Sequence, residues 1–97
     1  MVRYVVLFNF TDQGIRNVKE TMERAKAFKA VADKMGTHLK DLYWTQGPYD
    51  IVGIMEVPDE ETCMSLLLAL NSLGNVRSQT LRAFSGDEMK RILARMP

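Results

Sequence analysis

The stretch LYWTQGPYDIVGIMEV, residues 42–57, decides the fold, because a turn, GPYD at residues 47–50, separates two apolar segments. Aromatic and β-branched residues flank this turn, so residues 39–45 and 51–57 are predicted to form a β-hairpin. Glycine adopts the backbone angles that a following proline disfavours in other residues, and proline fixes one turn dihedral. The glycine and the proline are therefore assigned to the bend, which leaves the tyrosine and the aspartate to be explained.

The N-terminal segment has the pattern of a strand followed by a helix. Residues 4–10 form a near-continuous apolar run, which is typical of a strand buried on both faces. From Ile15 onward, apolar residues recur every three or four positions and predict an amphipathic helix that ends at Gly36. Because Thr21 could cap a new helix, residues 15–20 could instead form a separate short piece.

The segment after the hairpin repeats this pattern. Asp59 is predicted to cap a helix that ends near Gly74, and residues 76–84 have the composition of a fourth strand. Ser85 and Glu88 match a capping box, so a last amphipathic helix is predicted to follow.

The predicted order is strand, helix, strand, strand, helix, strand, helix, which defines an α+β fold. It is the ferredoxin-like βαββαβ arrangement with an added C-terminal helix, built on an antiparallel four-stranded sheet. No linker or low-complexity segment interrupts residues 1–97, so we expect a single domain.

Composition and charge narrow the range of partners. Thirteen basic and twelve acidic residues give a formal charge of +1 without a basic stripe, so nucleic acid is not an expected partner. The longest apolar run after the first strand, residues 66–70, is far shorter than the roughly 20 residues that span a bilayer, so no membrane partner is expected. Cys63 is the only cysteine, which excludes an intrachain disulfide and favours a cytoplasmic location.

Both faces of the predicted sheet are apolar, which predicts self-association. On the first strand, Val5 and Leu7 alternate with Val6 and Phe8. The second apolar face must be covered either by the last helix, which would leave a monomer, or by another subunit. One short helix cannot cover four strands, so we expect a homodimer or a higher homo-oligomer in which two sheets enclose a dimeric α+β barrel.

The chain resembles the GYD domain family in three segments that occur in the same order along the sequence. They are TDQGI at residues 11–15, GPYD at residues 47–50 and LGNVRSQTLRAF at residues 73–84. The resemblance implies the fold of the dimeric α+β barrel proteins. It carries over no catalytic residue and no substrate.

Polar residues of these segments are predicted to meet at one end of the sheet. In the expected strand order 4-1-3-2, Asp12 follows the first strand, Tyr49 and Asp50 enter the third, and Asn75 and Arg77 enter the fourth. We interpret this convergence as the polar end of a pocket between the sheet and the helices. Its expected ligand is a small apolar or aromatic molecule.

Structural roles compete with binding for these residues. Asp50 could accept backbone amide hydrogens, pair with Arg77 or transfer protons. Tyr49 could be a packed ring with a hydrogen-bonded hydroxyl, or an acid or base. Trp44, on the second strand, could line the cavity or fill an interface.

The sequence contains no phosphate-binding glycine loop, nucleophile elbow or paired acidic motif. His38 and the single cysteine show no metal-ligand spacing, so we expect neither a metal nor a cofactor. Two alternatives to a binding protein stay open. One is a cofactor-free enzyme that uses Asp50 or Tyr49 for proton transfer, and the other is a structural or interaction module without a cavity.

Overall fold

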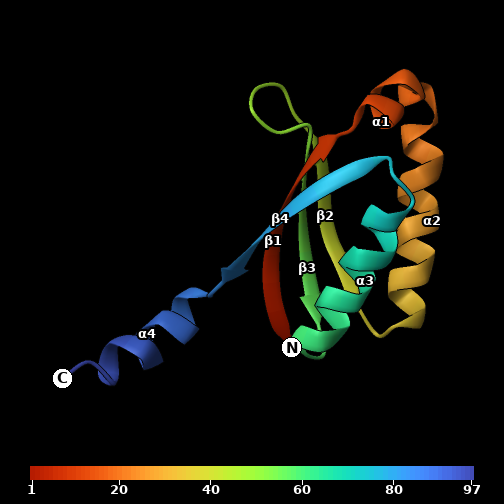
Figure 1. Ribbon diagram of the computed structural model, residues 1–97. Helices are drawn as coiled ribbons and strands as arrows, with labels where there is room; N and C mark the ends of the chain where they lie inside the picture. Colours follow the sequence, from red (N-terminus) through yellow and green to blue (C-terminus); the bar gives the residue numbers. More distant parts are fainter.

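The computed structural model describes residues 1–97 and contains one four-stranded sheet with its helices (Figure 1). The elements, in chain order, are β1 (Val2–Phe10), α1 (Asp12–Arg16), the 3-10 helix η1 (Val18–Glu20), α2 (Thr21–Lys34), β2 (His38–Trp44), β3 (Ile51–Val57), α3 (Glu60–Ser72), β4 (Val76–Ala83) and α4 (Gly86–Ala94). This order confirms the predicted ferredoxin-like βαββαβ fold with an added C-terminal helix.

The strands are arranged in the order β2-β3-β1-β4, and every neighbouring pair is antiparallel. Val6, near the middle of β1, pairs with Gly53 on β3 and with Thr80 on β4. The two central strands are therefore the first and the third, as predicted. The turn at residues 47–50 and the start of β4 consequently lie at the same end of the sheet as the end of β1 (Figure 1).

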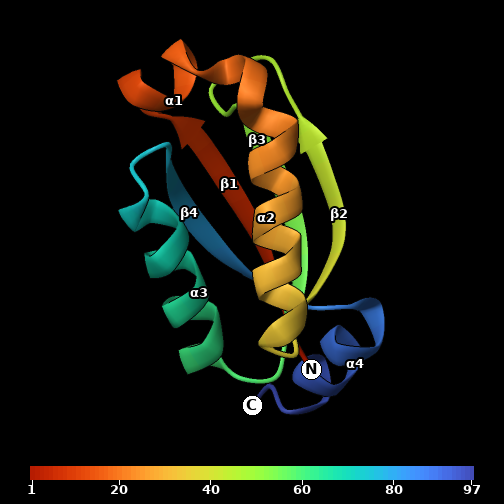
Figure 2. The ribbon, with the colours of Figure 1, turned by 90° about the vertical axis from the view of Figure 1, so that its right-hand side faces the viewer.

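Helices α2 and α3 cover one face of the sheet (Figure 2). The core lies between these layers, and its most completely buried hydrophobic side chains come from β1, β3, α2 and α3: Val6, Ala32, Met55, Val57 and Leu66. Along β1 burial alternates, because Val6 and Phe8 are buried whereas Val5 and Leu7 are only half-buried. In the isolated chain this strand is therefore buried on one face only, and burial of its other face by a second copy stays a prediction.

Local sequence signals explain where several elements begin and bend. The Asp59 side chain accepts a 2.7 Å hydrogen bond from the amide of Thr62 and so caps α3. Ser85 and Glu88 form the predicted capping box at the start of α4. Gly47 has a φ of +116°, a backbone conformation that L side chains rarely adopt, which explains the glycine in the hairpin turn.

The long helix predicted between the first two strands is divided. Residues 12–20 form α1 and η1, and α2 starts at Thr21 after Glu20 as its N-cap. The alternative of a separate short piece before Thr21 therefore holds, although Thr21 is the first residue of α2 and not its cap. No helix in the structure combines the length and the hydrophobicity that a membrane span requires.

The second face of the sheet is uncovered in the isolated chain. Strand pairing and alternation place on it the apolar residues Val5, Leu7, Val52, Ile54 and Leu81. An ion pair of 2.6 Å between Arg3 and Glu56 lies on the same face, and its hydrogen bond lowers the pKa of the Glu56 carboxyl. This uncovered face, formed by the five apolar residues named above with their neighbours, is called the open face below.

Helix α4 does not fold back over the open face. It extends from the end of β4 away from the sheet (Figure 1), so the predicted alternative in which the last helix closes the sheet is wrong. Arg82 fixes the junction, because its guanidinium stacks 4.3 Å from the ring centroid of Phe84 and lies 3.7 Å from the carboxylate of Glu88. The apolar stripe of α4, formed by Met89, Ile92 and Leu93, is consequently 39 to 56% exposed, and Met96 just beyond the helix is 65% exposed.

Candidate functional site

An apolar cavity of about 330 Å³ lies between the helices and the covered face of the sheet. Thirteen of its sixteen lining residues are hydrophobic. β1 contributes Phe8 and Phe10 to the wall, α2 contributes Phe28, and α3 contributes Leu66. The cavity therefore lies between the sheet and the helices α2 and α3, whose arrangement Figure 2 shows.

Small side chains on the helices leave this space unfilled. Ala25 and Ala27 on α2 and Ala69 on α3 all line the cavity. Since an alanine side chain is a single methyl group, these positions provide too little volume to close the gap between the two helices at native packing density. The apolar lining contains few groups that could hold water, and it suits an apolar guest.

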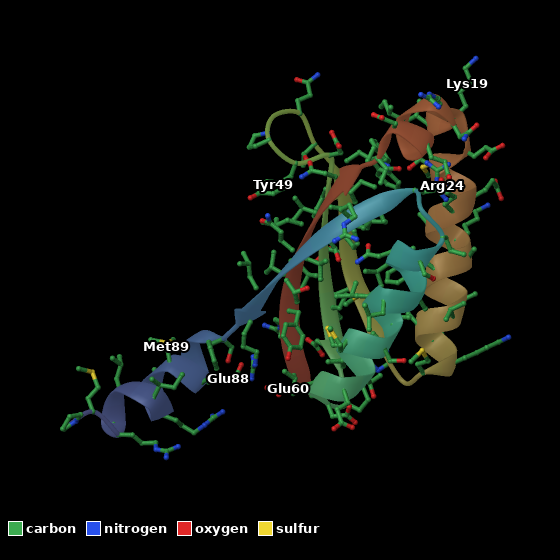
Figure 3. All side chains as sticks on the ribbon, viewed as in Figure 1. Lys19, Arg24, Tyr49, Glu60, Glu88 and Met89 are labelled. Atoms are coloured by element: carbon green, nitrogen blue, oxygen red, sulfur yellow. The ribbon has the colours of Figure 1, made fainter.

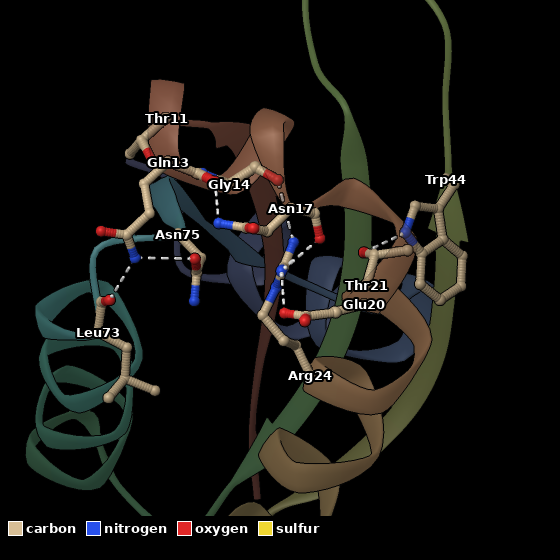
Figure 4. Close-up of polar contacts among 10 residues, drawn as sticks. All are labelled: Thr11, Gln13, Gly14, Asn17, Glu20, Thr21, Arg24, Trp44, Leu73 and Asn75. Atoms are coloured by element: carbon tan, nitrogen blue, oxygen red, sulfur yellow. Dashed lines mark hydrogen bonds and ion pairs between the residues drawn. The ribbon is translucent and has the colours of Figure 1, made fainter.

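Three polar residues, Thr21, Arg24 and Asn75, line the cavity and are called the rim below. They lie together at the end near α1 (Figure 4). The guanidinium of Arg24 donates hydrogen bonds to the carbonyls of Asn17, at 2.9 Å, and Gly14, at 3.3 Å. Its nearest carboxylate is that of Glu20, 3.9 Å away and largely exposed.

Thr11 forms three hydrogen bonds that connect the backbone segments at this end of the cavity. Its hydroxyl accepts a hydrogen bond from the amide of Gly14 and donates one of 2.5 Å to the carbonyl of Gly74. Its own amide donates to the carbonyl of Asn75, at 3.1 Å. The end of β1, the start of α1 and the loop before β4 are thereby held in contact.

The rim amide of Asn75 is oriented by a neighbouring glutamine. Gln13 Nε2 donates hydrogen bonds of 3.0 Å to Asn75 Oδ1 and 3.1 Å to the carbonyl of Leu73. The Nδ2 group of Asn75 is turned away from Gln13, toward the space between α3 and α2 (Figure 4). Asn75 is thus the one residue of the predicted site that lines the cavity.

Two other residues of the predicted site lie on the open face, across the sheet from the cavity. The Tyr49 hydroxyl donates a 3.1 Å hydrogen bond to Gln79 on β4, and Arg77 pairs with Asn9 on the same face. Figure 3 shows Tyr49 and the rim residue Arg24 on opposite sides of the sheet. The structure therefore does not bring Tyr49 or Arg77 to the cavity.

Asp50 joins three segments of backbone. Its carboxylate accepts a 2.8 Å hydrogen bond from the amide of Phe10, and its own amide donates to the carbonyl of Phe8, at 2.9 Å. Its carbonyl accepts from the amide of Thr45, at 2.8 Å. Asp50 and Arg77 do not form an ion pair, so that predicted alternative is wrong.

The last two predicted residues lie outside the cavity wall. Asp12 is exposed in the first turn of α1, where a carboxylate is favourable for the helix. Trp44 is partly exposed at the end of β2, and its indole N–H donates a 3.0 Å hydrogen bond to the hydroxyl of the rim residue Thr21. It therefore contacts the rim from outside.

The sequence analysis did not predict two of the three rim residues, Thr21 and Arg24, as part of a binding site. A signal was available, because Thr21, Arg24, Phe28 and Val31 follow the three-four-three spacing of one helix face. A charged residue on the same helix face as a buried phenylalanine indicates either a buried ion pair or a ligand site. Nowhere do three or more His, Cys, Asp and Glu side chains cluster in a way that could hold a metal.

Comparison with known proteins identifies the family. The model of the GYD domain family matches residues 4–93. The chain belongs to the GYD domain family. This GYD domain protein is also similar to a Thermus thermophilus protein named "Glutamine synthetase and cystathionine beta-lyase binding protein", with 32% identity over 84 residues, 86% of this chain and 88% of that protein.

Solved structures share the fold of this GYD domain protein. The crystal structure of TTHA0845 from Thermus thermophilus has a TM-score of 0.57 at 24% identity, with 89% of this chain and 96% of that chain covered. The crystal structure of FFRP-DM1 has a TM-score of 0.60 at 17% identity, with 87% of this chain and 100% of that chain covered. At these identities the likeness concerns the fold alone.

Proposed function

We propose that this GYD domain protein binds a small apolar or aromatic molecule in the cavity between its sheet and its helices. The observation that carries the proposal is the cavity itself, whose lining is hydrophobic at thirteen of sixteen positions and polar only at the rim. Ligand pockets in proteins have this composition and start at about 300 Å³. The proposed ligand is therefore small and mostly apolar.

A ligand screen with two matched variants tests this proposal. Native mass spectrometry and thermal shift would be measured against a library of small apolar and aromatic metabolites. Ala25→Leu adds volume to the cavity wall, whereas Ala30→Leu makes the same change on the exposed side of α2. Hits should disappear with Ala25→Leu and persist with Ala30→Leu. A library without any hit, or hits unaffected by Ala25→Leu, would count against the cavity as the binding site.

The functional unit in this proposal is a homodimer. Its support is the open face, where Leu81 is 51% exposed, together with the exposed apolar stripe of α4. Apolar surfaces of this kind mark sites of association. Two copies that pack sheet against sheet would bury the open face and leave the cavity, on the other side of the sheet, accessible.

The two alternatives derived from the sequence receive less support. Proton transfer by Asp50 or Tyr49 requires groups that face a bound substrate, but the Asp50 carboxylate is hydrogen-bonded to the backbone and Tyr49 lies across the sheet from the cavity. A purely structural module requires no cavity, and the volume between α2 and α3 argues against it.

A second candidate function is the binding of metabolic enzymes. Its support is the name of the Thermus thermophilus relative, which designates a binding protein of glutamine synthetase and cystathionine beta-lyase. The exposed stripe of α4 is an available contact surface. Surface plasmon resonance with both purified enzymes, before and after Leu93→Asp, tests this function. Binding that is lost with Leu93→Asp supports it, and no binding to either enzyme rejects it.

A further inference from the structure

We infer that the ligand of the cavity is an apolar carboxylate, with its hydrocarbon part between α2, α3 and the sheet and its carboxylate at Arg24. This inference rests on the proposed function, because it names the chemical class of the molecule bound in the same cavity. The geometry points to it through the charge, the hydrogen-bond donors and the size of the site.

Arg24 provides the positive charge of the cavity wall. Arg24 is the only charged residue among the sixteen that line it, and no Asp, Glu, Lys or His is present. The Arg24 side chain is only 21% exposed, whereas the side chain of Glu20, its ion-pair partner at 3.9 Å, is 72% exposed, so solvent screens that pair. An anionic group in the cavity would therefore compete for Arg24 only with the exposed carboxylate of Glu20, because no lining residue carries a negative charge.

The rim offers several hydrogen-bond donors. A guanidinium carries five N–H groups. Two of those of Arg24 donate to carbonyl oxygens, and the other three have no acceptor within hydrogen-bond distance, although the Glu20 carboxylate lies 3.9 Å from Nη1. Asn75 Oδ1 is already bonded to Gln13, which leaves the Nδ2 amide group to face the space between the helices. The Thr21 oxygen accepts from Trp44, so its hydroxyl hydrogen is available for donation. A carboxylate accepts hydrogen bonds from all three donors.

The same arrangement disfavours amino acids. An α-ammonium group needs an acceptor or a negative charge, and the cavity wall has no carboxylate side chain to provide one. The small volume, about 330 Å³, further limits the ligand to an aryl or short aliphatic chain. A simple carboxylate such as 3-phenylpropionate fits these requirements. Its amide, 3-phenylpropionamide, lacks the negative charge, and phenylalanine carries an ammonium group that the cavity wall does not neutralise.

Isothermal titration calorimetry with these three compounds tests the inference. 3-Phenylpropionate should bind about tenfold more tightly than 3-phenylpropionamide and than phenylalanine, because charge-assisted hydrogen bonds are the stronger ones. Arg24→Met keeps an apolar stem and removes the charge, so the acid-to-amide ratio should fall to about one. Arg77→Met removes the same charge on the open face and should leave the ratio unchanged.

A second rim variant covers the case in which Arg24→Met disturbs the contacts to Gly14 and Asn17. Asn75→Asp keeps an oxygen for Gln13 and places a negative charge at the rim, so it should weaken the binding of the acid about tenfold more than that of the amide. Equal affinities for acid and amide, or an equal effect of Arg77→Met, would overturn the carboxylate inference while the cavity still binds ligand. No binding of any of the three compounds would instead contradict the proposed function.

Discussion

Replacing Gly14 by alanine tests how the rim of the cavity is held. A Cβ atom at Gly14 would lie 1.9 Å from the carbonyl oxygen of Asn75 and 2.9 Å from its carbonyl carbon. Both are backbone atoms, so no side-chain rotation relieves the overlap. Either α1 or the loop before β4 must move for the variant to fold.

The expected cost follows from the overlap and from the contacts that the movement would break. Overpacking a well-packed site costs about 1–3 kcal/mol. The movement also strains the hydrogen bonds from Thr11 to the carbonyls of Gly74 and Asn75, which contribute about 1 kcal/mol each. We expect Gly14→Ala to lower the free energy of unfolding by about 2–4 kcal/mol, a large part of the roughly 5–15 kcal/mol that stabilises a domain.

Urea unfolding followed by the fluorescence of Trp44 measures this cost, at one fixed protein concentration because subunit association would add to stability. Gly86→Ala is the matched control, since nothing lies within 4 Å of a Cβ at that position and it begins α4. The control should change the free energy of unfolding by less than about 0.5 kcal/mol. If Gly14→Ala were as stable as this control, the close contact between α1 and the β4 loop would be refuted.

Three further predictions concern the turn, the last helix and the open face. Asp50→Ala should lower the free energy of unfolding by about 1–3 kcal/mol, because the amide of Phe10 loses its partner, and Asp50→Asn should lower it less; equal stability of all three proteins in urea would contradict this. The hydrogen bond from the Ser85 amide lowers the pKa of Glu88, so the ordering of α4 should be complete above pH 4.5, the ordinary value, and should decline below it. Amide chemical shifts of α4 followed against pH test this, and Glu88→Gln should remove the pH dependence. Ile54→Asp should convert the proposed homodimer to a monomer in light scattering, and an unchanged mass would reject the open face as the interface.

Local rules in the sequence account for most of the fold. The hairpin turn, the Asp59 cap and the capping box of Ser85 each depend on a few neighbouring residues, and they occur where such rules place them. The strand order followed from the alternation of strands and helices. The sequence did not decide whether the first helix is divided. The apolar spacing continues from Ile15 through Thr21, whereas Thr21 itself is a residue type that caps a new helix.

The candidate site was harder to predict because it depends on which side of the sheet each residue faces. Tyr49 and Asp50 are adjacent in sequence, yet the tyrosine reaches Gln79 on the open face while the aspartate binds the amide of Phe10. The sequence predicted that polar segments meet at one end of the sheet but did not separate its two faces. Arg24 was missed because its helix stripe was assigned from apolar residues alone.

The most direct test of the central claim is a two-dimensional amide NMR titration of the protein with 3-phenylpropionate. Binding in the cavity predicts shifts for residues of its wall, such as Phe28, Leu66 and Val76, and for Asn75 at the rim. Residues of the open face that border Tyr49, such as Gln79, should not shift. Shifts confined to the open face, with the cavity wall unaffected, would contradict the proposed site.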